Sequence, residues 1–150
     1  MGKSARNWWI GGAIVVVLIA LITWAGTRPE EVRQSTSGTS VEVSAPPASG
    51  RAGSPVPLTW AVHASVGAVA THTAVHWGTN STAGELGTEV APGAAGYPNL
   101  LPDYAQGSFA LPRTFTGAVV FPSTGAYYYR AHAIIEGKNY WSPEYSVVIQ

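Results

Sequence analysis

The chain contains no cysteine, and only 11% of its 150 residues are charged, with a formal net charge of zero. Without cysteine there are no disulfide bonds, no thiolate metal sites and no cysteine nucleophile. A chain with so little charge also lacks the basic surface on which nucleic acids bind, so we expect no nucleic-acid partner. Other metal ligands are scarce as well, because the only methionine is Met1 and the only aspartate is Asp103.

Catalytic motifs are also missing from the sequence. It has no Gly-x-Ser-x-Gly nucleophile elbow, no His-Glu-x-x-His motif and no glycine-rich phosphate loop. The carboxylates outside the N-terminal region and the first strand are scattered over expected loops: Glu85, Glu89, Asp103, Glu136 and Glu144. The sequence therefore predicts a protein that is not an enzyme.

The longest apolar run lies near the N-terminus, from Trp8 to Trp24, and carries no charge. A bilayer-spanning helix needs about 20 apolar residues, and tryptophan favours both membrane interfaces. We expect residues 1–7 to be cytoplasmic, because Lys3 and Arg6 precede the run, residues 8–26 to form a single transmembrane helix, and residues 27–38 to form a flexible stalk. A cleaved signal peptide is the alternative, although the segment Thr23-Trp24-Ala25 is a poor cleavage site.

Residues 39–150 are rich in short alternating segments separated by Gly, Pro, Asn and Ser, without an amphipathic helix. This pattern is typical of an all-β, antiparallel sandwich. The expected strands cover residues 39–44, 58–63, 71–77, 115–121, 126–135 and 145–149. The anchor would hold this domain outside the cytoplasm.

Three stretches carry a resemblance to immunoglobulin-like and fibronectin type III domains. VEVSAPPASGRAGSPVPLTWAV resembles the opening of bacterial and archaeal immunoglobulin-like domains, FPSTGAY resembles a fibronectin type III corner, and YYYRAHA with the following WSPE is similar to the last two strands. The resemblance implies a core containing Trp60, Val75, Trp77, Tyr127, Tyr129, Ala131 and Ala133. It also implies an outward face with His72, Ala74 and His76 on one strand and Tyr128, Arg130 and His132 on its neighbour. The connection from Gly78 to Pro112 is longer than the family pattern.

The histidines of that face are candidate metal ligands. His72 and His76 are four residues apart on a strand, hence about 13 Å apart, and cannot share an ion unless the strand bulges. His132 would oppose either His72 or His76, which gives a pair rather than the three or four ligands of a tight copper or zinc site. The sequence thus leaves three uses open: a metal site, a recognition face, or no specific role.

The long connection contains candidate partner contacts. Tyr97, Leu100, Leu101 and Tyr104 lie in a proline-braced loop, and aromatic residues are enriched at protein interfaces. Alternatively, the two leucines fold back and cover an open sheet edge. Tyr128 and Arg130 would extend the contact surface on the outward face.

Together these features predict a non-enzymatic, membrane-anchored binding or structural module outside the cytoplasm, without a cofactor. Its expected partner is a larger membrane complex or an envelope protein, which the small residues Gly11, Gly12 and Ala13 of the anchor would help to contact. Two alternatives remain: a copper- or zinc-handling accessory protein that uses the histidines, and a surface adhesion module.

Overall fold

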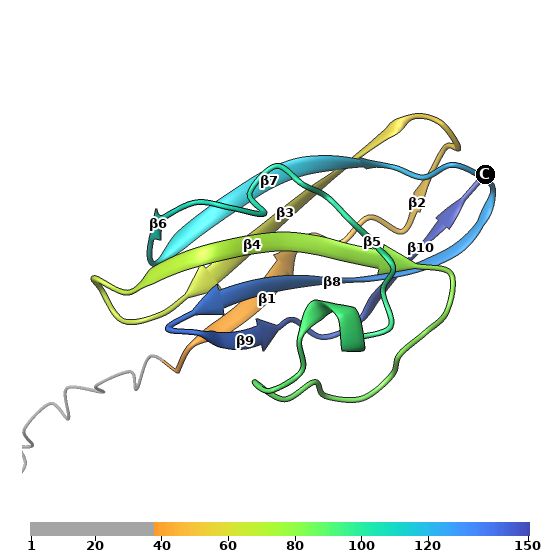
Figure 1. The fold of residues 1–150 in the computed structure, drawn as a ribbon. Helices are drawn as coiled ribbons and strands as arrows, with labels where there is room; N and C mark the ends of the chain where they lie inside the picture. Colours follow the sequence, from red (N-terminus) through yellow and green to blue (C-terminus); the bar gives the residue numbers. More distant parts are fainter. Residues whose placement is uncertain (1–37) are drawn as a thin grey trace, which may run out of the picture. The chain divides into compact units, whose positions relative to one another are not determined.

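The computed structural model describes residues 38–150, which form an all-β fold of two packed sheets (Figure 1). Among these residues the only helix is a single 3-10 turn, Pro92–Ala94, and no helix is long and apolar enough to cross a membrane. The predicted cytoplasmic segment, the transmembrane helix and all but the last residue of the predicted stalk lie outside the described residues.

The first sheet has three antiparallel strands in the order β1-β3-β7. The strands are β1 (Ser40–Ser44), β3 (Pro55–His63) and β7 (Arg113–Val120). In β1 and in most of β3, buried and exposed side chains alternate, because successive residues of a strand point to opposite faces.

The second sheet has seven strands, with the main order β2-β10-β8-β4-β5, while β6 pairs with β4 and β9 pairs with β8. The strands are β2 (Ser49–Gly50), β4 (Val69–Gly78), β5 (Asn99–Leu100), β6 (Phe109–Ala110), β8 (Gly125–Ile135), β9 (Lys138–Trp141) and β10 (Tyr145–Ile149). The pair β2–β10 is parallel, whereas the other strand pairs are antiparallel, as expected for this sandwich.

The core lies between the two sheets and contains the residues predicted for it. Trp60, Val75, Tyr127, Tyr129, Ala131 and Ala133 are buried, and Trp77 is partly buried against them. Trp60 stacks on Phe115 across β3 and β7, with ring centroids 5.7 Å apart. Its indole N–H donates to Thr73 Oγ1 of β4 at 2.8 Å, which joins the two sheets.

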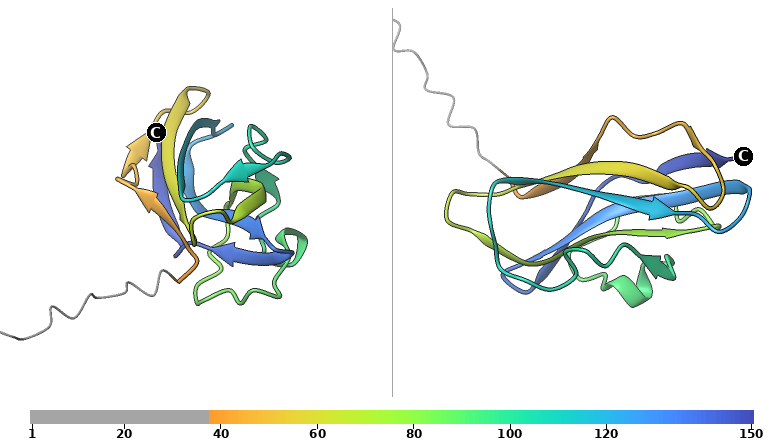
Figure 2. Two further views of the ribbon diagram at one scale, coloured as in Figure 1. Left: turned by 90° about the vertical axis from the view of Figure 1, so that its left-hand side faces the viewer. Right: turned by 90° about the horizontal axis from the view of Figure 1, so that it is seen from above.

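The first part of the long connection between β4 and β7, which includes the 3-10 turn, lies on the outer side of the seven-stranded sheet (Figure 2). Its later part pairs with β4 through β5 and β6, and Tyr104 reaches Trp60 of β3. The face that we expected to be exposed is therefore covered. His76, Arg130 and His132 are each no more than 2% exposed. This correction follows from the length of the connection, which crosses the sheet instead of turning directly into the next strand.

Candidate metal centre

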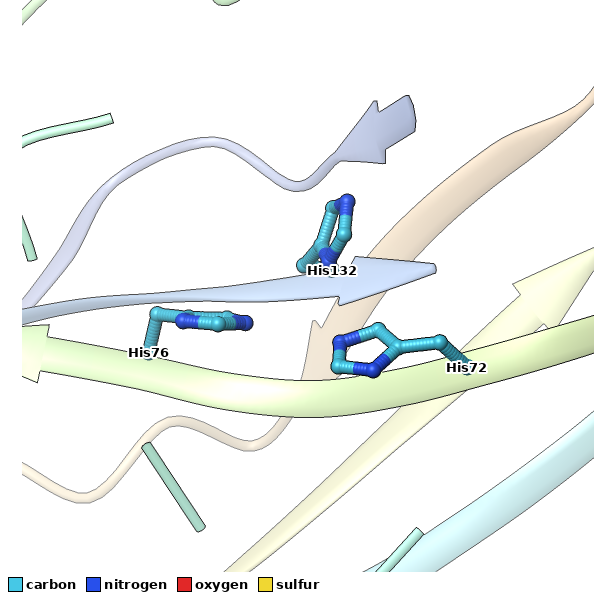
Figure 3. Close-up of side chains that lie close together, drawn as sticks. All are labelled: His72, His76 and His132. Carbon is cyan, nitrogen blue, oxygen red and sulfur yellow. The ribbon is translucent and has the colours of Figure 1, made fainter. Parts of the chain in front are cut away.

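Three histidines converge beneath this connection. His72 and His76 come from β4 and His132 from β8, and Figure 3 shows the three imidazole rings turned toward one another. The ring centroids are 5.8 Å apart for His72 and His76, 5.0 Å for His72 and His132, and 5.3 Å for His76 and His132. One ring nitrogen from each residue lies within 4.8 Å of the other two.

The strand register explains the convergence, and it differs from both registers that we expected. His132 lies opposite Ala74, midway between His72 and His76, rather than opposite either histidine. The register shift of β4 lies between Ala70 and His72, and pairing from His72 to His76 is regular. The expectation that the two rings come together only if the strand bulges between them is therefore wrong, because their ring centroids are 5.8 Å apart. Ala74 itself is small, so the two histidine side chains of β4 lean over it toward His132.

Hydrogen bonds orient two of the three rings. His72 Nδ1 lies 2.8 Å from the carbonyl oxygen of Ala105, and His132 Nε2 lies 3.0 Å from Asn139 Oδ1. Because oxygen accepts in each case, these nitrogens carry the protons in the neutral rings. The opposite nitrogens, His72 Nε2 and His132 Nδ1, then hold free lone pairs.

The free nitrogens have no other partner. Among the described residues, four buried side-chain polar atoms lack a hydrogen bond, and three of them are His72 Nε2, His76 Nε2 and His132 Nδ1. A buried polar group without a partner costs about 1–3 kcal/mol. Each of the three histidines thus has a buried ring nitrogen that no other protein group satisfies.

Burial keeps two of the imidazoles neutral. It lowers the pKa of His76 to about 4, with a further contribution from the nearby His72. It lowers the pKa of His132 to about 3, where His76 and His72 add to the effect and the hydrogen bond to Asn139 opposes it. Neutral imidazole is the form that binds metal ions, so these rings need not lose a proton at neutral pH.

The donor set fits a transition metal after a small contraction. Metal–nitrogen distances of about 2.0–2.1 Å place tetrahedral ligand atoms about 3.4 Å apart. The observed upper limit of 4.8 Å therefore requires the nitrogens to approach by at most roughly 1.4 Å. Three imidazole nitrogens suit zinc or copper and leave further coordination positions open.

Trp141 closes one side of the cluster. Its ring stacks on His132 with centroids 4.1 Å apart and meets His76 edge-on at 5.3 Å. The indole N–H donates to the carbonyl of Val90 in the long connection at 2.9 Å. On another side, His76 borders an open pocket of about 460 Å³ that Asn80, Tyr97 and Leu100 also line.

The predicted partner contacts are mostly buried. Tyr97 and Leu101 are 4% and 8% exposed, so the expectation that they present themselves to a partner is wrong. Leu101 and the half-buried Tyr104 pack on the core, so of the two leucines that the alternative expected to fold back, only Leu101 does so. Leu100 remains 44% exposed, and Tyr128 is half-buried.

Arg130 is a structural clamp rather than a surface group. Its guanidinium donates to the carbonyls of Thr82, Gly84 and Ser142 at 2.6–2.9 Å and to the hydroxyl of Tyr97 at 2.9 Å. The Tyr97 hydroxyl in turn donates to Glu144. All these groups belong to the long connection between β4 and β7 or to the segment after β9. Arg130 therefore holds this connection in place over the histidines.

Sequence reasoning missed Asn139, Trp141 and the carbonyl of Ala105 as parts of the site. Asn139 follows the Glu136-Gly137 turn, and the pairing of β9 with β8 places it near His132. A hairpin after residue 135 was therefore the available signal. Nothing in the sequence pointed to Ala105, because any residue offers a backbone carbonyl.

No protein-family model matches the chain and no curated protein is significantly similar to it, so the interpretation of the site rests on its geometry.

Proposed function

We propose that this protein is a membrane-tethered, extracytoplasmic module that binds a transition metal ion, copper or zinc, through His72, His76 and His132. One feature carries the proposal: the three histidines each place a ring nitrogen within 4.8 Å of the other two, and each ring also has a buried nitrogen without a hydrogen-bond partner. In such a site the protein contributes three neutral ligands and a water-poor surrounding. The remaining coordination position would be filled by water or by a ligand of the molecule that gives or takes the ion.

The strand order supports an immunoglobulin- or fibronectin type III-like version of the sandwich. Three strands pack as β1-β3-β7 against a sheet containing β10-β8-β4-β5. In the family resemblance, the neighbours β4 and β8 are the strands that carry the histidines. This fold is a scaffold and does not by itself imply a function, so the histidines rather than the sandwich distinguish this chain.

The location outside the cytoplasm depends on the N-terminal sequence. The uncharged run between Trp8 and Trp24 and the preceding Lys3 and Arg6 support a single-pass anchor with the domain on the outer side. A metal site made of imidazoles alone suits such a compartment, because it needs no reduced thiol.

A module that docks on a membrane complex is the second candidate function. Few of the residues predicted to contact such a partner are exposed. Among the four predicted contact residues of the loop, Tyr97, Leu100, Leu101 and Tyr104, only Leu100 is more than a third exposed. Arg130 is buried as well. Burial of these side chains favours metal binding over partner recognition as the role of this face.

Metal titration of the full chain tests the proposal. The protein is purified in mild detergent, stripped of metal with a chelator, and titrated with Zn²⁺ and with copper against a chromogenic competitor. His72→Ala and His132→Ala each remove one ligand, and His63→Ala is the matched control. His63 is the fourth histidine; it lies on the other sheet and pairs with Glu42.

We expect one ion per chain in the wild type and in His63→Ala. Loss of a direct ligand should weaken binding by more than the about 10- to 100-fold that loss of an outer hydrogen-bond partner causes. His72 is half-buried and is the variant that least disturbs packing, and circular dichroism checks that it folds. A wild type that binds no ion, or equal binding by all variants, would overturn the proposal.

A further inference from the structure

The long connection between β4 and β7 is tied to the outward nitrogens of two of the three histidines. Its Ala105 carbonyl accepts from His72 Nδ1 at 2.8 Å. Its Thr88 carbonyl accepts from Asn139 Nδ2 at 3.2 Å, and the side-chain oxygen of Asn139 lies 3.0 Å from His132 Nε2. In both histidines the hydrogen-bonded nitrogen is the one opposite the buried nitrogen that has no hydrogen-bond partner.

The donors and acceptors of the hydrogen bonds that link His132, Asn139 and Thr88 can be assigned in only one way. A carbonyl oxygen accepts and never donates, so Asn139 must turn its NH₂ group toward Thr88. Its Oδ1 then faces His132 and accepts, which places the His132 proton on Nε2. The lone pair is left on Nδ1, which is buried and has no hydrogen-bond partner.

Backbone hydrogen bonds fix the two carbonyl groups, of Thr88 and Ala105, at which these side-chain hydrogen bonds end. Thr88 O also accepts from the backbone N–H of Asn139 at 3.0 Å, so this carbonyl cannot swing away while β9 is in place. Near Ala105, the N–H of Thr73 donates to Tyr104 O at 3.0 Å and the N–H of Gly107 donates to Thr71 O at 3.1 Å. These bonds attach the loop to β4 on either side of the carbonyl that meets His72.

We propose that this connection sets the tautomers of His72 and His132, with Asn139 as the positioning residue for His132, so that both lone pairs face the metal position before any ion binds. The inference rests on the proposed metal site for its purpose, although the tautomers are properties of the metal-free protein. Outer-shell partners of this kind contribute about 10- to 100-fold to metal affinity.

Two substitutions separate positioning from structural support. Asn139→Leu removes both side-chain bonds, whereas Asn139→Asp keeps an oxygen for His132 Nε2–H but loses the donor to Thr88. The matched control is Asn99→Leu, which removes a similar bond, 3.3 Å long, from an asparagine amide of the same connection to the Trp77 carbonyl of β4. A purely structural role predicts that Leu and Asp at residue 139 do equal damage.

The measurement is ¹⁵N NMR of histidine-labelled, metal-free full chain near neutral pH, followed by Zn²⁺ titration of each variant. We expect the Nδ1–H form for His72 and the Nε2–H form for His132 in the wild type, in Asn99→Leu and in Asn139→Asp. In Asn139→Leu we expect a tautomer mixture at His132 and about 10- to 100-fold weaker Zn²⁺ binding.

A mixture at His132 in the wild type, or an unchanged His132 spectrum in Asn139→Leu, would overturn the inference. Equal loss in the Asp and Leu variants would also overturn it, because both lack the bond to Thr88. If the tautomers are as expected but the wild type binds no ion, the inference about the tautomers is supported and the proposed function is wrong. The two ideas are thus tested by different readouts.

Discussion

Mild acid should destabilise the metal-free protein strongly, because His76 and His132 are buried as neutral rings. Their pKa values in the fold are about 4 and about 3, against 6.5 for an ordinary histidine. Between these limits the unfolded chain binds protons that the folded chain does not. Stability is therefore fully present above about pH 6.5 and is lost as the pH falls toward the folded pKa values.

The size of the effect follows from these values. At about pH 5 the unfolded form of each histidine is almost fully protonated, while the folded form is mostly neutral. Relative to about pH 7.5, each residue then contributes about 2 kcal/mol of destabilisation, or about 4 kcal/mol for the two. This is a large share of the roughly 5–15 kcal/mol by which domains are stable.

Urea unfolding followed by tryptophan fluorescence measures this loss, with a chelator present at both pH values. A urea dependence of about 1–3 kcal/mol per molar predicts that the midpoint falls by more than about 1 M at about pH 5. His76→Gln removes one of the two buried titrating rings and should lose about half of the pH dependence.

This prediction is refuted if the urea midpoint of the wild type is the same at the two pH values. It is also refuted if His76→Gln keeps the full pH dependence, because another group would then be responsible. Saturating Zn²⁺ offers an internal check, since an ion that holds the rings neutral should reduce the loss at about pH 5.

Two further predictions concern the cover over the histidines. Arg130→Met should destabilise the fold by about 3–5 kcal/mol in urea unfolding, because three carbonyls and the Tyr97 hydroxyl lose their buried donor; a change below about 1 kcal/mol would show that the clamp is not needed. Leu101→Ala should cost about 2–3 kcal/mol and Leu100→Ala less than about 0.5, since Leu101 packs on the core and Leu100 is 44% exposed; equal effects on the thermal midpoint would contradict this assignment.

Much of the fold was predictable from local pattern. Alternation in segments such as residues 58–63 and 126–135 indicates which side chains face the core, because the period of a strand is two. The short strands β2, β5, β6 and β9 were missed, since two to four residues carry too little periodicity. The same alternation correctly assigned three aromatic residues to the core: Trp60, Tyr127 and Tyr129.

The three histidines of the candidate site were predictable from the sequence, but their arrangement was not. His72, His76 and His132 were identified as a shared face, but the expected pairings placed His132 opposite one of the other two. A shift of two residues along a strand keeps every side chain on the same face, so hydrophobic alternation does not distinguish between such registers. The pairing of Ala74 with His132 is therefore a result that only the assembled sheet provides.

The sequence by itself determined that the chain has no thiol chemistry, that residues 39–150 favour strands, and that three histidines belong to one sheet face. The first two conclusions depend on composition and on the two-residue period, which are local properties, and the third depends also on the family resemblance, which implies that the two histidine-bearing strands are neighbours. The tertiary structure decided that this face is covered, that His132 lies between its partners, and that Asn139 and Ala105 orient the rings. Those features depend on contacts between residues far apart in the chain, and local patterns contain no information about them.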